Sequence, residues 1–76
     1  MGKEMKGKEL LKLLKRYAAE HSLAFDYIPN MGKGGHGGIY LGDKRSIIPS
    51  PHKEIKTGTA LAIIKQLGLT KADLGL

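Results

Sequence analysis

The chain lacks cysteine and tryptophan, and only 5% of its 76 residues are aromatic. Without cysteine, neither a disulfide framework nor a thiolate metal site can brace the fold. At this length we expect a single domain over residues 1–76, with a thin core that rarely supplies more than roughly 3–5 kcal/mol. These limits exclude a large enzyme with a deep substrate cavity.

Acidic residues are also scarce. Seven Asp and Glu stand against thirteen Lys and Arg, which gives a formal net charge of +6, and the basic residues extend from Lys3 to Lys71. A small domain with this excess favours polyanions, and nucleic acid is the commonest polyanion in a cell. The alternative is that the charge serves only solubility.

Long hydrophobic runs are absent as well. No segment approaches the ~18 consecutive apolar residues of a membrane helix. Residues 1–8 alternate charge with glycine and lack the apolar stretch of a signal peptide. We therefore expect a soluble cytoplasmic protein that has no membrane partner.

The first clear periodic pattern predicts an amphipathic helix over Lys8–His21. Its apolar stripe, at i, i+3, i+4 and i+7, consists of Leu10, Leu13, Leu14 and Tyr17. Gly7 can serve as the N-cap, although Ser or Asp would do so better. Glu9 lies in the first turn, where the helix dipole favours an acidic side chain.

A second helix is predicted to begin near Thr57, a favourable N-cap residue. Its apolar stripe consists of Ala60, Ile63, Ile64 and Leu67. Gly68 suits the position just after the helix end. Thr70 and Asp73 have the spacing of a capping box, which predicts one more helical turn.

Three short segments between the helices have β character. Leu23–Ile28 alternates apolar and polar residues, Ile39–Leu41 is apolar, and Arg45–Ile48 follows a tight turn near Asp43. Strands linked by hairpins form an antiparallel sheet, and both helices must cover the same face to bury their stripes. The predicted fold class is α+β, in the order α-β-β-β-α.

Glycines are concentrated between the first two predicted strands. The segment from Gly32 to Gly37 fits G-x-G-x-x-G, but a dinucleotide-binding loop needs a strand before it and a helix after it. Here a strand follows, so we reject that interpretation. Glycine also permits unusual backbone angles, which explains a flexible loop but not the histidine within it. With glycine on both sides, His36 should be exposed.

The three histidines, His21, His36 and His52, are 15 and 16 residues apart, which does not suit a metal site. His21 at a helix C-terminus is explained by the helix dipole, and His52 by surface exposure. His36 is different because it opens a strand in the middle of the sheet. Imidazole titrates near neutral pH and can transfer protons during phosphodiester cleavage. A lone loop histidine is, however, more often only a solvated side chain.

Four segments together resemble the HicA toxins of HicA–HicB toxin–antitoxin pairs, in the family's order and over nearly the whole chain. They are the opening helix at 6–14, Gly34–Tyr40 with its Gly-x-His, Arg45–Pro49, and the Gly-Thr-initiated helix at 56–69. The Gly-x-His and the last segment are the specific ones. One residue departs from the family pattern, because Gly35 stands where relatives usually have Ser or Thr.

The resemblance implies a fold like that of double-stranded RNA-binding domains and an endoribonuclease that cleaves mRNA with no metal or other cofactor. It also implies a HicB-like antitoxin that covers the active surface, and contact with DNA only indirectly, through the antitoxin complex. The family's catalytic histidine corresponds to His36. With no hydroxyl at Gly35, either the activity is weaker or backbone N–H groups hold the phosphate there.

From the basic residues and the resemblance together, we expect His36 to be the catalytic residue, with the RNA bound around it. The expected RNA-binding residues are Lys33, Gly35, Lys44, Arg45, Lys8 and Lys12. A single histidine cannot act as acid and base in one step, so a second group is needed, with Lys33 or Tyr40 as candidates. Two alternatives stay open: a non-catalytic RNA-binding module, and a domain whose basic face meets an acidic protein.

Overall fold

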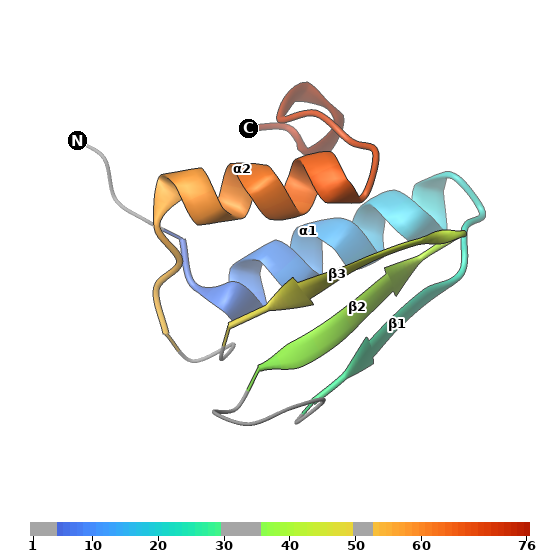
Figure 1. Ribbon diagram of the computed structural model, residues 1–76. Coiled ribbons are helices and arrows are strands. Elements are labelled where there is room, and N and C mark those ends of the chain that lie inside the picture. Colours follow the sequence, from blue (N-terminus) through green and yellow to red (C-terminus); the bar gives the residue numbers. More distant parts are fainter. Residues whose placement is uncertain (1–4, 30–35, 50–52) are drawn as a thin grey trace.

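The computed structural model describes residues 5–29, 36–49 and 53–76 of the chain. The elements are α1 (Gly7–Glu20), β1 (Phe25–Ile28), β2 (Gly37–Leu41), β3 (Lys44–Ile48), α2 (Thr57–Gln66) and the 3-10 helix η2 (Ala72–Leu74). Figure 1 shows this order along the chain. The α+β class and the α-β-β-β-α order predicted from the sequence are confirmed.

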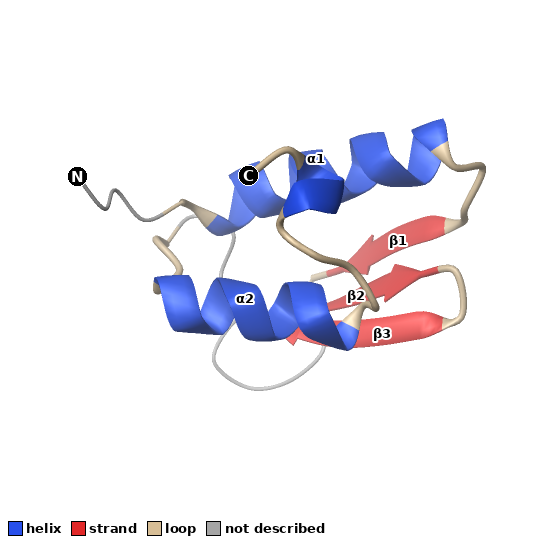
Figure 2. Ribbon diagram, turned by 90° about the horizontal axis from the view of Figure 1, so that it is seen from above, coloured by secondary structure: helices blue, strands red, loops and turns tan. Residues whose placement is uncertain are grey.

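The three strands form one antiparallel sheet with β2 in the centre. Both helices lie on the same face of this sheet, as Figures 1 and 2 show from two directions. Among the described segments, none covers the opposite face. The layered arrangement predicted from the apolar stripes is therefore confirmed. Over the same residues, the helices are too short or too polar to cross a bilayer.

The core lies between the sheet and the two helices. Leu10 and Leu14 of α1 are fully buried, as are Ile39 of β2 and Ile48 of β3. The stripe of α2 contributes Ala60, Ile63 and Ile64, and Leu67 just after the helix is buried as well. Each fully buried Leu or Ile side chain stabilises the fold by about 1.5–3 kcal/mol relative to an exposed position. The two stripes supply about half of the core, and the strands together with Ile55, Leu69 and Leu74 supply most of the rest.

Both helices begin differently from the sequence prediction. Gly7 is the first residue of α1 and not its N-cap, because the first intrahelical hydrogen bond already runs from Leu10 N–H to the carbonyl of Lys6, at 3.2 Å. The N–H of Gly7 donates to the carbonyl of Lys53 at 3.1 Å. Lys6 is the N-cap, with extended backbone, and its N–H donates to Glu9 Oε1 at 2.8 Å. Thr57 is likewise the first residue of α2, and Lys56 is the N-cap.

The strands also differ at their first residues. β1 begins at Phe25 and not at Leu23, because the N–H of Leu23 still donates to Ala18 O at 2.8 Å and closes the end of α1. β2 begins earlier than predicted, at Gly37, which pairs with Ile48. Glycine carries no β-propensity signal, so the pattern starting at Ile39 missed these first residues.

The end of α2 agrees with the sequence prediction. Gly68 follows the helix with φ +77°, and the N–H groups of Gly68 and Leu69 donate to Lys65 O and Ile64 O, the hydrogen bonds of a Schellman motif. The capping box is also present. Thr70 N–H donates to Asp73 Oδ2 at 2.9 Å, and Asp73 N–H donates to Thr70 Oγ1 at 3.2 Å.

Candidate active site and nucleic-acid interface

His36 lies directly before the central strand, with an exposed side chain. The next residue, Gly37, is buried and pairs with Ile48, the last residue of β3. The sheet therefore places His36 beside the end of β3. The pairing of Gly37 with Ile48 fixes the backbone directly after the histidine. The exposure predicted from the flanking glycines is confirmed.

Gly37 has a steric role that the sequence did not indicate. A Cβ atom at this position would lie 2.5 Å from Cε1 and 3.0 Å from the hydroxyl of Tyr27. The tyrosine ring on β1 thus occupies the space that any other residue would need. The glycine after His36 is required by packing, in addition to any freedom that it gives the loop.

A short backbone pairing ties the starts of the two helices together. Lys6 and Glu54 form an isolated antiparallel bridge. On either side of it, Gly7 N–H donates to Lys53 O at 3.1 Å and Ile55 N–H donates to Met5 O at 2.8 Å. The amino-terminal ends of both helices consequently lie next to each other, at the same end of the molecule as the beginning of β2 (Figures 1 and 2).

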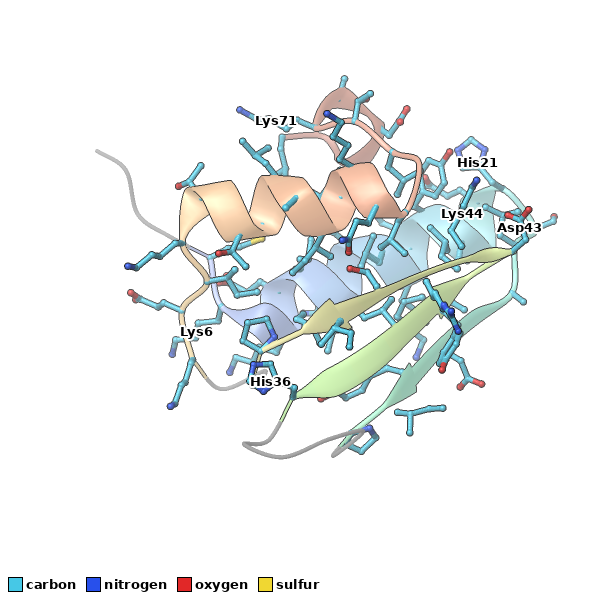
Figure 3. All side chains as sticks on the ribbon, viewed as in Figure 1. Lys6, His21, His36, Asp43, Lys44 and Lys71 are labelled. Carbon is cyan, nitrogen blue, oxygen red and sulfur yellow. The ribbon has the colours of Figure 1, made fainter. Side chains whose placement is uncertain are left out.

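Three exposed lysines gather at this end: Lys6, Lys53 and Lys56. Figure 3 shows Lys6 and His36 at the same end of the molecule. We call His36 and these three lysines the His36 end. Each helix adds partial positive charge here, because its N-terminus carries the positive end of the helix dipole. Three lysines thus lie at the same end of the molecule as the imidazole, together with the carboxylates of Glu9 and Glu54.

The first turn of α2 adds hydrogen-bond donors to the His36 end. Its N-cap, Lys56, makes no side-chain cap hydrogen bond, so the first N–H groups of the helix face solvent. Thr57, Gly58 and Thr59 are all exposed, and a Cβ on Gly58 would meet no atom within 4 Å. Backbone N–H groups at a helix start are suited to bind phosphate oxygens.

Lys44 and Arg45 do not lie beside His36. They begin β3, where Lys44 pairs with Leu41, whereas His36 precedes Gly37 at the other end of β2. Five residue steps along β2 separate His36 from Leu41, the partner of Lys44, or roughly 17 Å. Figure 3 shows Lys44 at the opposite end of the sheet from His36. In an antiparallel hairpin, residues next to the tight turn are necessarily far from the open end, so our expectation of one cluster was wrong.

The other expected site residues are distributed as follows. Lys8 and Lys12 are exposed on α1, where they line a depression with Met5, Leu13 and Leu76. The predictions for Lys33, Gly35 and His52 concern residues outside those that the structure describes. The roles of Lys8, Lys12, Lys33 and Gly35 in binding RNA therefore stay predictions.

Two further residues considered in the sequence analysis, His21 and Tyr40, do not belong to the His36 end. The ring of His21, at the end of α1, stacks on Tyr17 with ring centroids 4.1 Å apart. Tyr40 is half-buried near the far end of β2. It lies four residues along the chain from His36, or roughly 13 Å in extended backbone. The structure therefore does not place Tyr40 directly beside His36, and its role as the second catalytic group stays a prediction.

The sequence analysis missed Lys6 and Lys56 as parts of the site. The available signal was that a lysine precedes each helix, at Lys6-Gly7 and Lys56-Thr57. Only the backbone pairing shows that these two lysines, 50 positions apart in the chain, flank one end of the fold. Among the described residues, no three His, Asp or Glu side chains gather in a way that could hold a metal ion.

Comparisons with protein-family models, with curated proteins and with solved structures found no match to this chain.

Proposed function

We propose that the chain is an endoribonuclease that cleaves mRNA without a metal ion, with His36 as general acid or base. The observation that carries this proposal is the His36 end: one exposed imidazole before the central strand, with three exposed lysines and two helix starts at the same end of the molecule. The resemblance to HicA toxins supports the same assignment, because the catalytic histidine of that family corresponds to His36.

The chemistry that this arrangement suits is transesterification. The 2′-oxygen of a ribose forms a bond to the adjacent phosphorus as its proton is removed, and the bond from phosphorus to the 5′-oxygen breaks. The products are a 2′,3′-cyclic phosphate and a 5′-hydroxyl that has gained a proton. His36 performs one of the two proton transfers. The lysines stabilise the negative charge that builds on the phosphate oxygens.

The proposal also names a regulator. A nuclease acting on mRNA arrests growth, so its activity needs to be restrained by a partner that covers the His36 end. By the resemblance, this partner is a HicB-like antitoxin, and the pair, not this chain alone, contacts DNA.

The test is incubation of the purified protein with single-stranded RNA, with and without a chelator. We expect cleavage in both conditions, and we expect His36→Ala to lower the rate by about 10²- to 10⁴-fold, the usual contribution of general acid–base catalysis. His21→Ala is the matched control, because His21 is an exposed histidine at the opposite end of the fold. It should cleave like the unsubstituted chain.

Two outcomes would contradict the proposal. If His36→Ala cleaves RNA as fast as His21→Ala, the imidazole is not catalytic. If RNA is bound in a salt-dependent way but recovered intact from the unsubstituted chain, the protein is a non-catalytic RNA-binding module. A substrate with 2′-deoxyribose at the cleaved position tests the nucleophile, since it should not be cut.

A further inference from the structure

The sheet face opposite the helices carries two rows of side chains that the proposed reaction does not use. Asp26 pairs with Tyr40, and Tyr40 pairs with Arg45, so these three residues form one row across the strands. The next row consists of Ile28, Gly38 and Ile47. Ile39 and Leu41 of the same central strand are buried in the core. Because side chains alternate along a strand, both rows lie on the open face.

This open face carries two exposed isoleucines beside its polar row. Ile47 is 59% exposed and Ile28 is 41% exposed. Gly38 lies between them and has no side chain, so the middle of this row is a shallow depression next to the Tyr40 ring. In the part of the chain that the structure describes, Asp26, Tyr40 and Arg45 make no side-chain hydrogen bond or ion pair with another residue.

The size of the face favours a small occupant over a second copy of the chain. Three strands of four or five residues cover about 14 Å by 15 Å, or ~200 Å². A stable protein–protein interface needs about 800 Å² from each partner. A nucleobase, by contrast, is an aromatic plate that can stack on the accessible side of the half-buried Tyr40 ring. A nucleotide also carries N–H donors that a carboxylate can accept from and a phosphate that a guanidinium can bind, and the row has Asp26 at one edge and Arg45 at the other.

We propose that the open face binds an unpaired base of the RNA by stacking it on Tyr40, with its Watson–Crick edge toward Asp26 and its backbone toward Arg45. Stacking on aromatic side chains of a sheet is a general mode of single-strand recognition. A carboxylate accepts hydrogen bonds only, so it favours the base with the most adjacent donors on that edge. Guanine offers N1–H and the N2 amino group together, whereas uracil offers a single N–H.

This inference rests on the proposed function for its ligand, RNA, but it concerns a separate surface. Tyr40 lies roughly 13 Å along the strand from His36, so the stacked base is not attached to the ribose that is attacked. The open face would set which sequence is held, while the His36 end carries out the cleavage. The expected result is a preference for guanine a short distance from the cut.

The experiment measures binding in the His36→Ala background, so that cleavage does not interfere. Fluorescence anisotropy follows labelled ten-nucleotide oligouridylates that carry one central guanosine, inosine or uridine. We expect the guanosine oligonucleotide to bind most tightly. Tyr40→Leu should weaken its binding by about 5- to 100-fold, whereas Tyr40→Phe should retain it. Asp26→Asn should remove the preference for guanosine over inosine and uridine.

Tyr17→Leu and Asp43→Asn are the matched controls, because these residues lie away from the open face, on α1 and in the β2–β3 turn. Thermal melting of every variant verifies that it is folded. Unchanged affinity in folded Tyr40→Leu overturns the inference, as does a change from dimer to monomer in that variant, which would make the face a self-interface. Neither result affects cleavage by the chain with His36 intact, so failure of this inference is distinguishable from failure of the nuclease assignment.

Discussion

Gly37 is the residue on which the placement of His36 depends most directly. It joins the histidine to the central strand, and its lack of a side chain leaves room for the Tyr27 ring. From the sequence alone, the run of glycines around His36 predicts a flexible loop. The structure instead shows that the last glycines of the run are buried strand residues, so the backbone after His36 is held by sheet pairing.

Gly37→Ala should therefore destabilise the fold. The new methyl group would lie 2.5 Å from Tyr27 Cε1, and overpacking of this kind typically costs about 1–3 kcal/mol. Urea denaturation measures the loss. Because the cost arises from one contact, it should shrink by at least ~0.5 kcal/mol when Tyr27 is replaced by alanine. Strictly additive effects of the two substitutions would show that the contact is not the cause.

At the scale of elements, α2 has a glycine at each end, and replacing the two glycines should have opposite effects on stability. Gly58 lies in the first turn, where a side chain would meet open space. Gly68 follows the last turn with φ +77°, in the left-handed region that other residues avoid. The same substitution at the two positions should therefore change stability in opposite directions.

We expect Gly58→Ala to stabilise the protein by about 0.4–1 kcal/mol, because alanine restricts the unfolded chain and suits a helix. Gly68→Ala should destabilise it by roughly 1–2 kcal/mol, the cost of the left-handed conformation for a residue with a Cβ. Thermal or urea unfolding of both variants checks the signs. Destabilisation by Gly58→Ala would indicate that the space beside the first turn is occupied.

The elements could be predicted from the sequence where side-chain patterns define them. The stripes from Leu10 to Leu14 and from Ala60 to Ile64 place both helices and their buried faces correctly. The starts of elements were less predictable, because they depend on backbone hydrogen bonds from distant segments. Gly7 is satisfied by Lys53 O, and Gly37 is fixed by pairing with Ile48. Neither partner can be inferred from local sequence.

The same limit applies to the candidate site. Its histidine could be singled out, because glycines on both sides predicted the exposure that the structure confirms. Its cationic neighbours could not, because which lysines share an end of the molecule depends on chain topology. The antiparallel hairpin takes Lys44 away from His36, and the pairing of Lys6 with Glu54 brings the two helix starts, with Lys56, to its side.

For the whole molecule, we expect RNA binding to depend on where the lysines lie and not only on how many there are. The double variant Lys53→Gln/Lys56→Gln removes two charges from the His36 end, whereas Lys15→Gln/Lys65→Gln removes two exposed charges from the second halves of α1 and α2. In the His36→Ala background, the first pair should reduce the slope of log affinity against log salt by about 1.4, since each lost contact to a single strand contributes ~0.7.

The second pair is the control, because it changes the net charge equally. Its slope should stay close to that of the parent. Equal reductions in the two double variants would mean that RNA senses only the overall charge and does not contact the His36 end in particular.

Under the proposed function, the pairing between the segments that precede α1 and α2 has a consequence for how the molecule approaches RNA. It fixes two helices side by side with the same polarity, as Figures 1 and 2 show, so their fields add instead of cancelling. A protein whose electrostatic potential is more positive at one end experiences a torque near a polyanion and rotates during its approach. Collisions with RNA would then begin with the imidazole facing the strand, and fewer encounters would be wasted on the wrong side.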